Sequence, residues 1–173
     1  MSAVATFSTY AQPWTREALV EGHFVGFLPF SALSLSDVPA LPGVYAVLRT
    51  SEALPRFVEQ SPAGRLKGKD PSASIETLAA KWVDGPQVLY IGKATTGSAG
   101  RRGLQKRLDD FRRFGAGEAV NHPGGRYLWQ LADKDELLVA WNATYEDAAT
   151  VESRMLGDFV NRYDALPFAN LRR

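Results

Sequence analysis

The pattern of hydrophobic and polar positions along the chain predicts short strands mixed with helices. Apolar runs between glycine, proline and polar turn residues predict strands, and apolar positions three or four residues apart predict helices. The expected strands cover residues 44–48, 88–91, 127–131 and 137–141. The expected helices cover residues 74–82, 103–114 and 146–163. Ser74 is the expected cap of the first helix.

These elements do not alternate as regular strand–helix–strand units, so they predict an α+β fold with a small, mainly antiparallel sheet flanked by helices. Residues 1–40 carry scattered proline and aromatic residues, and we expect an N-terminal extension packed on a domain formed by residues 41–173. Residues 49–87 form a long insertion between the first two strands. Its Lys67 and Lys69 could touch a nucleic-acid backbone or simply be solvated.

The net charge of +1 says little about partners, but the basic residues are unevenly distributed. Between residues 93 and 113 only Asp109 and Asp110 oppose a run of cations. These cations are Lys93, Arg101, Arg102, Lys106, Arg107, Arg112 and Arg113. Such a region is typical of a phosphate-binding face, and equally of a solvated helix face.

Several classes of function are excluded or made unlikely by what the sequence lacks. There is no cysteine, which excludes disulfides, thiolate zinc sites and cysteine nucleophiles. The chain shows no signal-peptide pattern and no apolar stretch of roughly 20 residues, so we expect a cytoplasmic protein without membrane contact. The common phosphate-loop, dinucleotide-binding and zinc-protease motifs are also missing.

One carboxylate lies where apolar side chains are expected. At helical spacing Glu152 falls on the same stripe as Ala148, Leu156 and Phe159, whereas the other acids of that helix fall outside it. A buried carboxylate is costly unless it is paired with a cation or bound to a metal. Glu152 therefore indicates either a structural ion pair or a functional site.

Arg107 has a comparable position on the shorter helix, at the edge of the stripe formed by Leu104, Leu108 and Phe111. It could lay its stem along the core and keep its charge in water. It could equally be held to meet a phosphate or Glu152.

Tyr45 and Tyr90 each interrupt an otherwise aliphatic strand, and either one alone is explained by core packing. The order of features is more specific. Gly-Val-Tyr ends at residue 45, Tyr-Ile-Gly-Lys begins at residue 90, and then come Arg107, Glu152 and a Pro-Phe-Ala-Asn segment ending at Asn170. Over residues 42–171 this series resembles the GIY-YIG nuclease superfamily. The resemblance implies a three-stranded antiparallel sheet flanked by helices.

The resemblance also implies a metal-dependent endonuclease that hydrolyses nucleic-acid phosphodiester bonds, on DNA rather than RNA, with one Mg²⁺ or Mn²⁺ ion. The implied metal ligand is Glu152, and Arg107 would steady the scissile phosphate. Tyr45 and Tyr90 would line the site, one of them as general base or water-positioning group.

Two further residues follow from the resemblance: Lys93 would assist the reaction and Asn170 would support the site by hydrogen bonding. A tyrosine can act as a base only if cations lower its usual pKa of about 10. We expect Lys93, Arg107 and the metal to do so. The expected nucleic-acid contacts are Lys67, Lys69, Arg101, Arg102, Lys106 and His122.

One position departs from the family pattern. Members often carry His or Tyr one turn after the helix arginine, where this chain has Phe111, which cannot donate a hydrogen bond. His122 and Tyr127 are the candidates to replace it. The alternative function is a nucleic-acid-binding module with this fold and weak or no cleavage. The sequence leaves both a monomer and a homodimer open.

Overall fold

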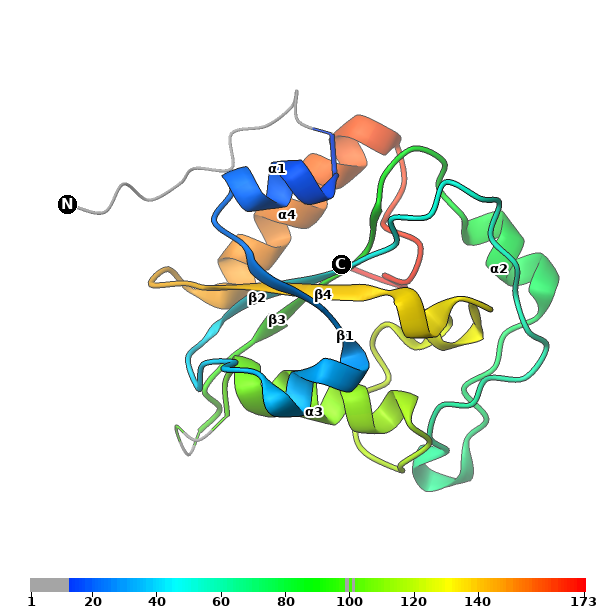
Figure 1. The fold of residues 1–173 in the computed structure, drawn as a ribbon, viewed down its shortest axis with the longest axis horizontal. Helices are drawn as coiled ribbons and strands as arrows, with labels where there is room; N and C mark the ends of the chain where they lie inside the picture. Colours follow the sequence, from blue (N-terminus) through cyan, green and yellow to red (C-terminus); the bar gives the residue numbers. More distant parts are fainter. Residues whose placement is uncertain (1–12, 99, 101) are drawn as a thin grey trace.

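The computed structural model describes residues 13–98, 100 and 102–173, and its centre is a four-stranded antiparallel sheet with the strand order β1-β4-β2-β3 (Figure 1). The strands are β1 (Val25–Pro29), β2 (Gly43–Leu48), β3 (Val88–Ala94) and β4 (Leu138–Ala143). The helices are α1 (Arg16–Glu21), α2 (Ile75–Lys81), α3 (Leu104–Gly115) and α4 (Ala148–Tyr163). Short 3-10 helices are η1 (Phe30–Leu35), η2 (Leu66–Gly68), η3 (Arg126–Gln130) and η4 (Lys134–Glu136). The expected α+β class is confirmed.

The sheet has four strands rather than the expected three. The additional strand, β1, comes from the N-terminal extension, where the sequence pattern was too irregular to assign elements. It pairs with β4, and its register shifts between Gly26 and Leu28. Strand β1 thereby covers an edge of β4 that would otherwise expose unpaired backbone groups.

The expected strand at residues 127–131 is wrong, because this segment forms η3 instead. The backbone nitrogens of Leu128 and Leu131 donate to the carbonyls three residues earlier, those of Gly125 and Leu128, which is the 3-10 pattern and not a strand ladder. Gly125, just before η3, has the left-handed φ of 74° that starts the turn.

The two faces of the sheet are covered by different helices. Helices α1 and α4 lie on one side, and α3 with η1 lies on the other (Figure 1). Strand β2 is buried on both sides, and its side chains alternate between the two cores. Tyr45 and Val47 belong to the core under α3, whereas Val44, Ala46 and Leu48 belong to the core under α4.

The described part of the N-terminal extension is built into the second of these cores. The Trp14 ring lies 5.6 Å from the Phe159 ring of α4, and Leu19 is fully buried. The Trp14 carbonyl also accepts hydrogen bonds from the backbone of Gln87 and Val88, at the start of β3.

The buried amide of Gln130 is one of the groups that tie the insertion between β2 and β3 to the rest of the chain. The Gln130 side chain accepts from the backbone nitrogen of Ala73 and donates to the carbonyls of Val58 and Ala73. Ser74 caps α2 by accepting from the Thr77 nitrogen, as the sequence predicted. Among the described residues, no helix is long and apolar enough to cross a membrane.

We expect Trp14→Ala to lower the free energy of unfolding by about 3–5 kcal/mol, because it leaves a cavity between α1 and α4. Val20→Ala on the exposed side of α1 should change it by less than about 0.5 kcal/mol. Chemical denaturation measures both. If both variants lost the same small amount of unfolding free energy, the extension would not contribute to the stability of the domain.

Candidate active site

A cleft of about 490 Å³ lies beside the edge strand β3. Its lining includes Tyr90 and Lys93 of β3, Arg107 of α3, Glu152 of α4, and Asn170 near the C-terminus. Helices α3 and α4 lie on opposite faces of the sheet, so their side chains can share one cleft only around an edge. The position of β3 at the edge therefore brings these residues together.

Glu152 is paired with Lys93, not with Arg107. The Lys93 Nζ lies 2.7 Å from the Glu152 Oε2, and the Glu152 side chain is only 17% exposed. This pair provides the compensating charge that a carboxylate on the apolar face of α4 requires. It also leaves the carboxylate at the wall of the cleft, where it can meet a ligand.

Tyr45 lies behind the cleft and is fully buried at the centre of a hydrogen-bond network. Its hydroxyl is 3.2 Å from the His122 Nε2, and the His122 Nδ1 is 3.1 Å from the carbonyl oxygen of Gly124. A carbonyl only accepts, so Nδ1 carries the proton and Nε2 accepts from Tyr45. Arg107 and Tyr90 also interact with the Tyr45 hydroxyl, and because its proton is engaged with His122, both are placed to donate to its oxygen.

Burial dominates the ionisation of the two tyrosines. It raises the pKa of Tyr45, and the positive charge of Arg107 opposes this rise without overcoming it. It also raises the pKa of Tyr90 well above 10, with the neighbouring Tyr45 adding to the effect. In the protein without metal or substrate, the charge of Arg107 acts in the expected direction on both pKa values, but burial outweighs it.

Of the two candidates named for the role missing at Phe111, His122 lies beside Phe111. Its ring stacks on the Phe111 ring at 4.1 Å with an angle of 6° between the planes. Burial and then the charge of Arg107 lower the pKa of His122 to about 3, so the imidazole is neutral near pH 7. Tyr127, the other candidate, packs against Phe168 instead. Because His122 is fully buried, it lies away from the surface where a nucleic-acid contact was expected.

Asn170 makes hydrogen bonds to the strand rather than pointing its amide at the cleft. Its Oδ1 accepts from the Ile91 nitrogen and its Nδ2 donates to the Ile91 carbonyl, both at 2.9 Å. The backbone nitrogen of Ala169 also donates to the Leu89 carbonyl. The C-terminal segment is thus fastened to the outer edge of β3, between the two cleft residues Tyr90 and Lys93.

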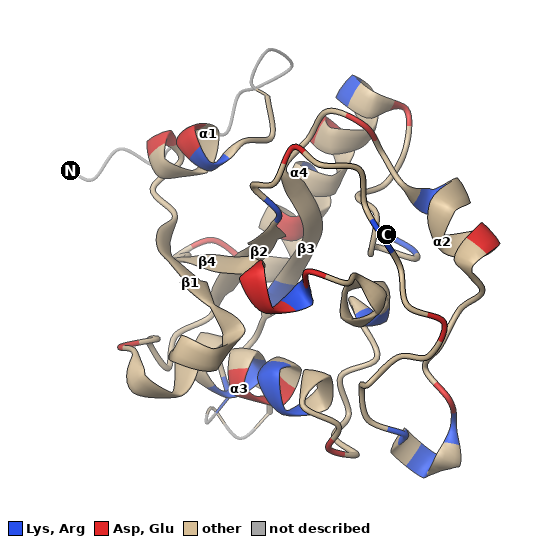
Figure 2. Ribbon diagram, turned by 45° about the vertical axis from the view of Figure 1, so that its right-hand side comes forward, with Lys and Arg blue, Asp and Glu red and all other residues tan. Residues whose placement is uncertain are grey.

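Basic and acidic residues lie close together on α3 (Figure 2), and several of the cations there are paired with carboxylates. Arg102 and Lys106 both pair with the buried Asp110, and Arg112 pairs with Asp109 at 2.7 Å. Of the predicted nucleic-acid contacts, Lys67 and Lys69 are exposed on the insertion and do not line the cleft, and Arg101 lies outside the described residues.

The cleft contains cations that the sequence did not single out as site residues. Arg126, Arg172 and Arg173 line it, together with the loop at Gly124 and Gly125. The Arg126 Nε is buried and has no hydrogen-bond partner among the described residues. The only sequence signal was an arginine directly after a Gly-Gly turn.

Only one described side chain of the cleft, Glu152, carries a carboxylate that could hold a divalent cation. Among the described residues, no three His, Cys, Asp or Glu side chains are grouped to hold a metal. Glu152 is the one acid among the lining residues. Mg²⁺ is commonly held by one or two carboxylates, with water and substrate phosphates completing its oxygen ligands.

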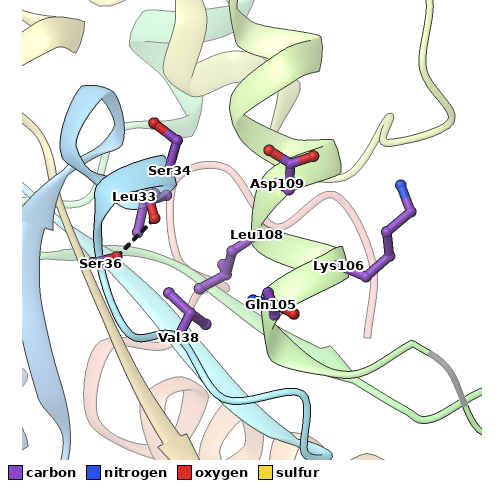
Figure 3. Close-up of a pocket in the computed structure, with 8 residues that line it drawn as sticks. All are labelled: Leu33, Ser34, Ser36, Val38, Gln105, Lys106, Leu108 and Asp109. Atoms are coloured by element: carbon purple, nitrogen blue, oxygen red, sulfur yellow. Dashed lines mark hydrogen bonds between the residues drawn. The ribbon is translucent and has the colours of Figure 1, made fainter.

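A second hollow, of about 330 Å³, lies between η1 and α3 and holds none of the proposed catalytic groups (Figure 3). It is lined by Leu33, Val38 and Leu108 together with small polar side chains, and Lys106 is directed away from Leu33 and Val38.

Comparison of the chain with protein-family models, with curated proteins and with solved structures found no match.

Gly92→Ala should disturb the site directly. An added Cβ at this position would lie 2.4 Å from the Tyr45 Cζ, and Tyr45 has no free space to move into. We expect a loss of about 1–3 kcal/mol in the free energy of unfolding. Gly157→Ala in α4 meets nothing within 4 Å and should stabilise the protein by about 0.5–1 kcal/mol. Thermal and denaturant unfolding distinguish the two, and a neutral Gly92→Ala would contradict the close packing.

His122 should make the protein less stable as the pH falls. Its pKa of about 3 lies below the ordinary value of 6.5, so the unfolded chain binds a proton first. Its contribution to stability is complete above pH 6.5 and declines toward pH 3, by about 1.4 kcal/mol per pH unit. The difference in unfolding free energy between the wild type and His122→Gln, measured from about pH 7 to pH 4, isolates this contribution. Parallel curves for the two proteins would refute it.

Proposed function

We propose that the protein is a GIY-YIG-type endonuclease that hydrolyses phosphodiester bonds in nucleic acid, with DNA as its preferred substrate and one divalent metal ion as cofactor. The observation that carries the proposal is the cleft beside β3. It gathers Tyr90, Lys93, Arg107 and Glu152 from three separate elements, in surroundings that are otherwise mostly basic or small. Positive charge beside a single carboxylate suits a metal-assisted reaction on a phosphate.

Arg107 is suited to bind the scissile phosphate. It forms no ion pair with a described residue, and its contact with the Tyr45 hydroxyl holds it at the cleft. The planar guanidinium can offer two parallel N–H donors to two phosphate oxygens. In the proposed complex Arg107 fixes the phosphate and stabilises the charge that develops on it.

Glu152 is the residue that would hold Mg²⁺ or Mn²⁺. When bound, such an ion polarises the phosphate and stabilises the leaving oxygen. Lys93 now occupies one oxygen of this carboxylate, so its ammonium must share or leave Glu152 when the metal binds. Lys93 lies at the wall of the cleft, where its released charge would meet the substrate phosphate.

The two tyrosines have different tasks in this proposal. Tyr90 lines the cleft, whereas Tyr45 is buried behind it. Tyr90 donates its proton to the Tyr45 oxygen, and Tyr45 donates to His122. This direction leaves a lone pair of the Tyr90 oxygen available to a water in the cleft. Tyr90 therefore orients the attacking water, and the raised pKa of both phenols argues against a resting tyrosinate.

The second candidate is a nucleic-acid-binding module with the same fold and little or no cleavage. It is favoured by the Lys93–Glu152 ion pair, which competes with metal binding, and by tyrosines that burial keeps protonated. Such a module would bind nucleic acid whether or not Glu152 keeps its charge.

The deciding experiment is cleavage of supercoiled plasmid, branched DNA, single-stranded DNA and RNA with Mg²⁺, Mn²⁺ or EDTA. We expect metal-dependent cutting of DNA, lowered about 100-fold or more by Glu152→Gln, because the proposed metal ligand is lost. The matched control is Glu146→Gln, which removes the same charge from an exposed pair with Arg154 just before α4. It should cut at the wild-type rate.

Equal cutting by Glu152→Gln and the wild type would refute the assigned metal ligand. If the wild type and Glu152→Gln both bound nucleic acid without metal and cut no substrate, the binding module would be established instead. Circular dichroism of each variant ensures that a loss of activity is not a loss of fold.

A further inference from the structure

Among the described cations of the basic run in the sequence, all except Arg107 are paired with a carboxylate. On α3, Arg102 and Lys106 share the carboxylate of Asp110, and Arg113 pairs with Glu118. A phosphate that approached this face would have to compete with carboxylates that lie within hydrogen-bonding distance. The outer face of α3 is therefore a poor site for a phosphate backbone.

The cleft beside β3 has the opposite balance. Besides Lys93 and Arg107 it is lined by Arg126, Arg172 and Arg173, and its one acid, Glu152, is already paired with Lys93. Its volume of about 490 Å³ exceeds the space that one phosphate group occupies. More than one negative group can therefore be accommodated there.

Arg126 is the cleft cation with a buried N–H group that lacks a partner among the described residues. Its Nε is buried, and no described residue accepts from it, although a buried guanidinium N–H normally has a partner. The guanidinium carbon lies 5.7 Å from the centre of the Tyr127 ring, which supports the side chain from one side. Arg126 is thus positioned by the protein but left without an anion to bind.

The backbone before Arg126 shapes the same part of the cleft. A Cβ at Gly124 would lie 2.6 Å from the Tyr90 hydroxyl, and a Cβ at Gly125 would lie 2.7 Å from the Phe111 ring. The loop can pack this closely only because both residues lack side chains. Arg126 therefore comes directly after a segment that packs against Tyr90 and Phe111.

We propose that Arg126, assisted by Arg172 and Arg173, forms a second phosphate subsite, which binds a backbone phosphodiester next to the one that Arg107 holds. The inference rests on the proposed function, since it assigns the ligand as a nucleic-acid strand. The subsite adds a residue that positions the nucleic-acid strand without touching the reacting atoms. It also moves the nucleic-acid contact from the face of α3 to the cleft.

The test measures binding alone, on the Glu152→Gln background without metal, by fluorescence anisotropy of a short labelled DNA strand and duplex over a range of salt concentrations. Arg126→Gln should weaken binding by about 10-fold and lower the slope of log affinity against log salt by about one phosphate contact. Arg126→Lys keeps the charge but loses the Nε donor. Its affinity should lie between that of the parent protein and that of Arg126→Gln. The control, Arg112→Gln, removes the same charge from α3 and should leave affinity and slope unchanged.

Wild-type affinity and slope for both Arg126 variants, with binding lost in Arg107→Gln, would overturn the subsite and leave the proposed function intact. Equal losses for Arg126→Gln and Arg112→Gln would also overturn it, because they would indicate only a general effect of net charge. Failure of the parent protein to bind either DNA probe would overturn the subsite, and if the wild type also cuts no substrate, the proposed function is overturned with it.

Discussion

Strand β3 is an edge strand, and its outer backbone groups need partners that no neighbouring strand among the described residues supplies. The C-terminal segment supplies them, because the Asn170 amide satisfies both the N–H and the carbonyl of Ile91, and Ala169 donates to Leu89. A buried edge left unpaired would lose the free energy of several hydrogen bonds. The same contacts hold Tyr90 and Lys93 in place on either side of Ile91, so the position of the cleft depends on them.

The edge position also explains how residues from opposite faces of the sheet come to share one site. Arg107 approaches from the α3 side and Glu152 from the α4 side, and in the interior of the sheet the strands would separate them. At β3 the Glu152 carboxylate is paired with Lys93 and not with Arg107. A carboxylate for a metal and a guanidinium for a phosphate can thus lie in one cleft without neutralising each other.

Periodicity singled out two helix side chains that line the cleft, but it left open whether they form a structural ion pair or a site. Glu152 and Arg107 stand on or beside apolar stripes, and the packing that buries those stripes necessarily directs both residues inward. Strand β1 could not be predicted, because its residues are exposed or half-buried and show no alternation. The role of His122 was equally inaccessible, since it depends on how a loop of about ten residues closes over Phe111. The ion pairs of α3 depend on side-chain conformations, which cannot be read from the number of charged residues.

The network around Tyr45 shows why a buried tyrosine pair can serve a reaction without being a base at rest. The Tyr45 oxygen donates to His122 and accepts from Arg107 and Tyr90, so its hydrogen-bonding capacity is filled inside the protein. With a pKa of about 3, His122 is a weak proton acceptor and serves to fix the direction of these bonds. That direction runs from the cleft inward, which leaves Tyr90 as an acceptor toward any water that enters. In the proposed nuclease the strength of the nucleophile must therefore come from the charges around the phosphate, while the phenols determine where the water stands.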